Sequence, residues 1–120
     1  MIKEFIPYEQ ALALKELGFD ESCFGHYWKK LFYFQTTHYH PATMPNSPES
    51  CLAPTFSQAF RFFREKYNLV IVIKPISDIK LELGYNITKN GLIIKACSTY
   101  EEAELACLIK LIETVKTKQP

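Results

Sequence analysis

The 120-residue chain lacks a strong excess of either charge: 14 Lys and Arg residues stand against 13 Asp and Glu residues, a formal net charge of +1. A protein that coats DNA or RNA non-specifically needs a clear excess of basic residues, so this class is not expected. No apolar run approaches the roughly 20 residues that span a membrane. The first residues, MIKEFIPYEQ, also lack the apolar core of a signal peptide. We therefore expect a cytoplasmic protein without membrane partners.

Glycine and paired cysteines are also scarce. The four glycines are isolated, so neither a P-loop nor a dinucleotide-binding fingerprint occurs, and no cofactor is expected. The four cysteines are scattered without a CxxC pair, which favours free, partly buried thiols over a disulfide or a zinc motif. These cysteines are Cys23, Cys51, Cys97 and Cys107.

Apolar and aromatic residues, in contrast, are plentiful. They reach 48% and 14% of the chain, enough for one domain over residues 1–120 with a single core. The order of predicted elements is α, a β-hairpin, α, three strands and α. This order indicates an α+β fold in which an antiparallel sheet, with a C-terminal three-stranded meander, packs against three helices.

Two helices are predicted from their end signals. The first covers Pro7–Leu17, because proline suits a first turn and Gly18 provides a left-handed stop, after which Phe19 folds back. The last covers Tyr100–Lys116, with Ser98 and Thr99 as alternative N-caps. Its apolar stripe is predicted to consist of Leu105, Leu108, Ile109, Ile112 and Val115.

The middle helix, Phe56–Tyr67, interleaves phenylalanines with arginines. Thr55 and Gln58 form a predicted capping box, and Asn68 suits a left-handed exit. Helical spacing gathers the apolar side chains into one stripe and turns the arginines elsewhere, which favours a core face over a base-stacking platform. The stripe contains Phe56, Ala59, Phe60, Phe63 and Tyr67. Phe62 lies off this stripe and needs a covering element or a partner.

The strand predictions rest on alternation and turn chemistry. CFGHYWKKLFYFQ reads as a hairpin turning near Trp28–Lys30, and Leu69–Pro75 as a strand that is apolar on both faces. Asn90-Gly91 predicts a two-residue type I′ turn, which places Ile87 opposite Ile94 and Tyr85 opposite Ala96. Between the hairpin and the middle helix, the proline-rich residues 36–54 are expected to form a long surface loop.

Several groups are candidates for function. A basic and aromatic surface is predicted from Arg61, Phe62, Arg64, Lys29 and Lys30, and it keeps a nucleic-acid-associated regulatory role open. The element order from Thr55 onward is similar to that of double-stranded RNA-binding domains, but STYEEAELA places glutamates where that family needs lysines to meet phosphate.

Metal binding and catalysis have weaker candidates. His38, His40 and Cys51 are the zinc candidates, although their spacing is not that of a zinc motif, and no metal is expected. A Cys23–His26 nucleophile pair lacks an orienting acid, so no catalytic residue is expected and enzymatic activity stays doubtful.

The aromatic hairpin residues, Tyr27, Trp28, Phe32, Tyr33 and Phe34, either fill the core or form an interaction surface. The core is the favoured alternative, and an exposed remnant that makes a dimer contact is its competitor. A homodimer through the strand Leu69–Pro75 or through Phe62 is likewise left open.

Three segments together resemble a family of small uncharacterised proteins of Bacteroidetes, their prophages and crAss-like phages. These segments are EFIPYEQALALKELGFDE, APTFSQAFRFFREKY and TYEEAELACLIKLIE. The resemblance implies a protein made inside a bacterial or phage-infected host cell, an accessory protein of a mobile element. It implies no activity and no site residues, so binding to an unknown protein partner is the expected function.

Overall fold

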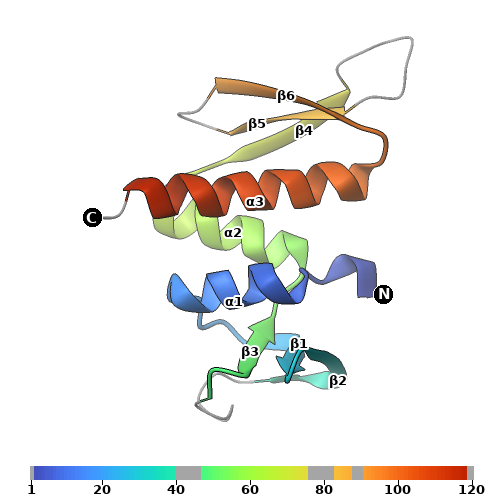
Figure 1. Cartoon of the computed structure of the whole chain (residues 1–120), viewed down its shortest axis with the longest axis vertical. Coiled ribbons are helices and arrows are strands. Elements are labelled where there is room, and N and C mark those ends of the chain that lie inside the picture. Colours follow the sequence, from blue (N-terminus) through green and yellow to red (C-terminus); the bar gives the residue numbers. More distant parts are fainter. Residues whose placement is uncertain (1, 40–46, 76–82, 88–90, 119–120) are drawn as a thin grey trace. The chain divides into compact units, whose positions relative to one another are not determined.

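The computed structural model describes residues 2–39, 47–75, 83–87 and 91–118. It is an α+β structure with three helices, as predicted, and its described strands form two antiparallel sheets where a single sheet was expected (Figure 1). The chain divides into two compact units, Met1–Ala59 and Phe60–Pro120, and each is described by itself. The expectation of one domain over residues 1–120 stays a prediction.

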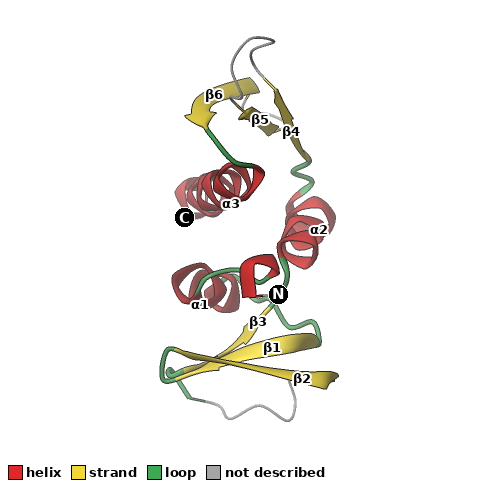
Figure 2. Cartoon of the chain, turned by 90° about the vertical axis from the view of Figure 1, so that its right-hand side faces the viewer, coloured by secondary structure: helices red, strands yellow, loops and turns green. Residues whose placement is uncertain are grey.

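The first unit contains a three-stranded antiparallel sheet and a helix. Its elements are a short 3-10 helix at Ile2–Glu4, α1 at Tyr8–Glu16, β1 at Cys23–Trp28, β2 at Leu31–Tyr39 and β3 at Ser50–Ala53. The strand order is β2-β1-β3, so β1 is central. Helix α1 lies against β3 (Figure 2).

The end of α1 confirms the predicted glycine stop. Gly18 has a φ of 94°, and its N–H donates to Lys15 O at 3.1 Å, while Phe19 N–H donates to Leu14 O at 2.9 Å. This pair of bonds is a Schellman motif, and it returns the buried Phe19 ring toward the core.

The predicted hairpin is confirmed, with Trp28 opposite Leu31. Its two turn residues, Lys29 and Lys30, have φ values of 52° and 69°. Two successive positive φ angles are those of a type I′ turn, whose twist matches the strands that it joins. Lysine is an unusual residue for this conformation, so the strand pairing on either side maintains a turn that the sequence itself disfavours.

The predicted loop over residues 36–54 is wrong at both ends. The strand β2 continues to Tyr39, and Ser50–Ala53 forms β3, which pairs with β1 from Trp28↔Ser50 to Gly25↔Ala53. The flanking Pro48 and Pro54 only limit this strand to four residues, since proline ends a ladder without preventing one beside it. Residues 40–46 lie outside the described part of the chain.

A lysine joins the start of β3 to helix α1. Lys15 Nζ donates to the carbonyl oxygens of Ser47 and Ser50 at 2.7 Å and 2.6 Å. Ser50 N–H donates to Ser47 O at 3.1 Å, which closes a turn. The charged donor thus satisfies two carbonyls at the point where the chain enters the sheet.

Helix α2, Phe56–Tyr67, begins in the first unit and continues into the second. The predicted capping box is confirmed in both directions. Thr55 N–H donates to Gln58 Oε1 at 3.1 Å, and Gln58 N–H donates to Thr55 Oγ1 at 3.2 Å. Asn68 leaves the helix with a φ of 57°, as predicted.

The sheet of the second unit has the order β4-β5-β6, formed by Ile71–Pro75, Leu83–Ile87 and Gly91–Cys97. The predicted register of its second hairpin is wrong. Ile87 pairs with Gly91 and Tyr85 with Ile93, in place of Ile94 and Ala96. Because residues 92–94 read Leu-Ile-Ile, apolar alternation there fits either register and could not fix it.

The strand β4 is not covered on both faces. Val72 is 53% exposed, while Leu69, just before the strand, is buried.

Helix α3, Tyr100–Lys118, packs on this sheet. Thr99 is the N-cap, because Thr99 Oγ1 accepts from Glu102 N–H at 3.1 Å. The predicted apolar stripe is partly wrong: Ile109 is exposed, whereas Cys107 and Leu111 are buried.

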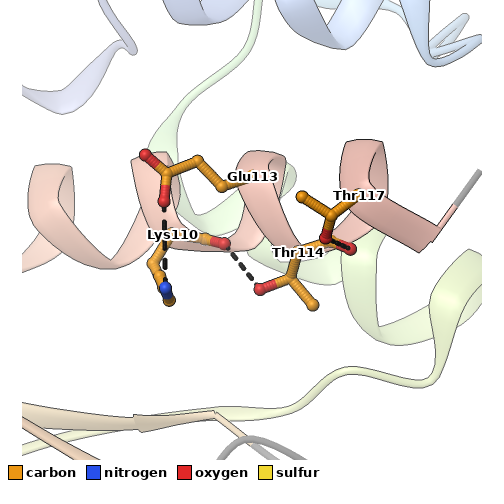
Figure 3. A network of polar contacts seen from close by, with 4 residues as sticks. All are labelled: Lys110, Glu113, Thr114 and Thr117. Carbon is orange, nitrogen blue, oxygen red and sulfur yellow. Dashed lines mark hydrogen bonds and ion pairs between the residues drawn. The ribbon is translucent and has the colours of Figure 1, made fainter.

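Polar contacts along the same helix stay local (Figure 3). Thr114 Oγ1 donates to Lys110 O at 2.8 Å, Thr117 Oγ1 donates to Thr114 O at 3.0 Å, and Lys110 lies 3.9 Å from Glu113.

Gly25 allows side chains to approach the backbone of the first sheet closely. A Cβ atom there would lie 2.7 Å from Phe32 Cε1 and 3.1 Å from Phe5 Cδ1. We predict that Gly25→Ala destabilises the protein by about 1–3 kcal/mol, because overpacking forces those rings to move. Urea unfolding measures the loss. In a Phe32→Leu background the same substitution should cost less, and an equal cost in both backgrounds would contradict the ring clash.

Candidate functional site

The predicted basic and aromatic surface falls on two elements in different units. Lys29 and Lys30 are exposed in the β1–β2 turn, and Arg61 and Arg64 are exposed on α2. Phe62, by contrast, is only 7% exposed, so its prediction as a surface residue is wrong.

Phe62 is buried together with its aromatic neighbours. Its ring packs edge-on against Phe63 and Tyr67, with centroids 5.4 Å and 5.9 Å away, and Lys66 Nζ lies 5.4 Å from its centroid. The apolar side of α2 is therefore wider than the single stripe that was predicted. The central expectation is confirmed, since Phe56 and Phe63 are buried while the arginines are exposed.

The first sheet has two different apolar faces. Along β1, burial alternates: Cys23, Gly25 and Tyr27 are buried, while Phe24, His26 and Trp28 are more exposed. The buried face packs inward. Tyr27 Oη donates to Ile6 O at 2.8 Å, and the Tyr27 ring lies 5.5 Å from that of Phe32.

The opposite side of the β1–β2 hairpin forms what we call the outer face: Phe24, His26, Trp28, Leu31 and Tyr33. Register places four of its members in two facing pairs, His26 with Tyr33 and Trp28 with Leu31. Phe24 lies at the irregularity between Cys23 and Gly25, and its ring is 6.3 Å from that of Phe34. Three members of the outer face are exposed, Leu31 by 62%, Tyr33 by 42% and Phe24 by 38%. An antiparallel sheet more often presents polar residues on its solvent side.

The outer face is uncharged as well as apolar. None of the 19 residues of β1, β2 and β3 is Asp, Glu, Lys or Arg. The imidazole of His26 stacks on Tyr33 with ring centroids 5.3 Å apart. Burial lowers the pKa of His26 below its usual 6.5, so this imidazole is neutral at neutral pH. At the β1–β2 turn, Lys29 Nζ lies 5.7 Å from the Trp28 ring.

The sequence showed an aromatic hairpin but not which residues would be exposed. Of the five aromatic residues considered, Tyr27 is in the core and Tyr33 and Phe34 are exposed, so both alternatives hold in part. Leu31 and Phe24 were missed. The signal that could have found them is the period of two, which separates Phe24 from Tyr27.

The Cys23–His26 pair does not form a dyad, because burial alternation along β1 places the two side chains on opposite faces. Burial, with a smaller effect of Glu21, raises the pKa of Cys23 from 9.0 to about 12, so the thiol stays protonated. A protonated, buried thiol is a poor nucleophile.

The zinc candidates are not assembled in the described part of the chain. There, no group of three or more His, Cys, Asp or Glu side chains is placed to hold a metal ion. Cys51 is buried, and burial raises its pKa to about 11, against a smaller lowering by Lys15. His40 and the side chain of His38 lie outside the described residues.

Comparisons with known proteins give no family. No family model matches the chain, and neither a curated protein nor a solved structure is significantly similar to it. None of the helices in the described ranges has the length and apolar character needed to cross a membrane.

Burial of the cysteines predicts slow alkylation of their thiols in the native chain. All four thiols are free and buried, and burial raises the pKa of Cys107 to about 12. We expect a thiol-specific alkylating reagent to modify the native chain far more slowly than the urea-unfolded chain at neutral pH, because the buried thiols become accessible to the reagent only after opening. Mass spectrometry of timed samples counts the modified thiols. A cysteine that reacts at the unfolded rate under native conditions would contradict its burial.

Proposed function

We propose that this protein acts without catalysis, by binding another protein through the outer face of its first sheet. One observation carries this proposal: the uncharged β1–β2 hairpin leaves Leu31, Tyr33 and Phe24 exposed. The centres of protein–protein interfaces are depleted in charge and enriched in aromatic residues, and this face has both properties.

The chemistry of the face supports protein as the ligand. Single exposed apolar residues are ordinary on protein surfaces, but a contiguous group on one side of a sheet is typical of an interaction site. Tyr33 and Trp28 are also residue types that often dominate binding energy, since each presents a large rigid ring with one polar atom.

Charge argues against a nucleic-acid ligand for the same face. Aromatic platforms that stack bases are accompanied by a positive groove that follows the phosphates. Residues 1–59 contain four Lys and no Arg against six Asp and Glu, a net charge of −2 with histidine neutral. Two turn lysines, Lys29 and Lys30, are a small positive contribution beside this balance.

The family resemblance adds a biological setting to the proposal, that of an accessory protein of a phage or other mobile element acting in the bacterial cytoplasm. Genes beside the coding sequence test this setting. We expect phage or integration genes nearby in several genomes. A location among housekeeping genes throughout would contradict it.

A photo-crosslinking residue at position 33 tests the surface directly. Tyr33 and Tyr100 are tyrosines of comparable exposure, 42% and 54%, and of the two Tyr33 belongs to the outer face. We predict that benzoylphenylalanine at position 33, irradiated in expressing cells, gives a defined protein adduct that the same residue at position 100 does not. Denaturing electrophoresis and peptide mass spectrometry identify the adduct.

A companion substitution checks that the adduct reports binding. Leu31→Gln removes the most exposed apolar side chain and should reduce the adduct at position 33 several-fold. Similar adducts from positions 33 and 100, or an adduct unaffected by Leu31→Gln, would contradict the proposed surface.

A further inference from the structure

We infer that the protein bound by the outer face is a second copy of the same chain, packed with its strands antiparallel to those of the first. This inference rests on the proposed function, because it names the partner of the same surface. It is drawn from charges at the two ends of the sheet, which the binding proposal does not use.

The central strand separates two small groups of opposite charge. Asp20 and Glu21 come just before β1, and Lys29 and Lys30 follow it directly. The six residues of β1 span about 20 Å at the usual rise of a strand, so its two ends are distinct places. The lysine end also holds exposed Glu49, whose backbone carbonyl accepts from Lys29 N–H at 3.0 Å, and Lys15, whose Nζ donates to Ser50 O at 2.6 Å, so three lysines stand against one glutamate there. Asp20 and both turn lysines are exposed, and Glu21 is half-buried.

A two-fold axis turns this arrangement into self-complementarity. In a symmetric pair the same surface of both copies is used, and when the two-fold axis runs across the strands each end of one sheet meets the opposite end of its partner's sheet. The lysines of each copy then face Asp20 and Glu21 of the other, so the same charge contact forms at both ends of the pair. A parallel arrangement would place like charges together, which is unfavourable.

The uncharged middle of the sheet permits the same pairing. When a surface pairs with its own copy, any charge at its centre lies near an identical charge and the two repel each other. The three strands carry no formal charge, so this repulsion does not arise here. Two sheets pack face to face about 10 Å apart, a geometry in which the Leu31 and Tyr33 side chains of both copies would fill the space between them. A different partner with a single sign of charge would match one end and be repelled at the other.

Charge reversal tests the inference on the full-length chain. One variant carries Lys29→Asp with Lys30→Asp, since aspartate tolerates the positive φ angles of that turn. The other carries Asp20→Lys with Glu21→Lys. A matched control, Arg64→Asp with Lys74→Asp, reverses two exposed charges outside the first sheet, one on α2 and one on β4.

Sedimentation velocity over a wide range of loading concentration should show a dimer for the wild type and the control. Each reversed variant alone should dissociate at least tenfold more readily, and an equimolar mixture of the two should recover the dimer. A monomeric wild type, or a mixture that stays dissociated, would overturn the inference. Reversed variants that behave like the control would also overturn it.

The crosslinking experiment separates this inference from the proposed function. An adduct of position 33 with a different protein would overturn the inference that the partner is a second copy, while leaving the proposed binding surface intact. A monomer without any adduct at position 33 would remove both.

Discussion

The close contact across Gly25 is the constraint on which the first unit depends. Because this residue has no Cβ, the Phe32 and Phe5 rings, 5.1 Å apart, occupy the space beside its backbone. That contact commits Phe32 to the inner face together with Tyr27, its cross-strand neighbour. Alternation along the strands then forces the outer residues outward. The exposure of Leu31 and Tyr33 is thus a consequence of inner packing, in a hairpin whose two faces are both apolar.

The sequence predicted the local chemistry of the chain well. The capping box at Thr55 and Gln58, the glycine stop after α1 and the positive φ of Asn68 are each decided by neighbouring residues, and each is confirmed. The strand β3 was missed because its ladder comes from β1, more than twenty residues earlier, and its sequence, Ser-Cys-Leu-Ala, has no β-branched residue. Tertiary pairing made a strand where local preference indicated a loop.

The remaining errors come from apolar sequences that satisfy more than one arrangement. Leu-Ile-Ile at residues 92–94 fits two registers, and the buried side of α2 is wide enough to include Phe62. The candidate surface could not be predicted from the sequence for the same reason. A hairpin with aromatic residues on both sides gives no local signal of which side the rest of the chain covers. The placement of Phe5, Ile6 and Tyr8 against the Tyr27 side decides it. Patterns of hydrophobicity therefore predicted the existence of this hairpin, but could not predict its exposed face.

In the first unit the apolar surface and the charges lie in different places, so the apolar surface would determine the affinity for a partner and the charges would determine the partner's orientation. Burial of an uncharged face is non-directional, so on its own it would allow a partner sheet to sit at many angles. Exposed ion pairs contribute little stability, typically below about 1 kcal/mol each, yet they discriminate between orientations because the wrong one brings like charges together. With Asp20 and Glu21 at one end of β1 and two lysines at the other, the same few charges that contribute little to affinity are sufficient to favour the antiparallel arrangement over the parallel one.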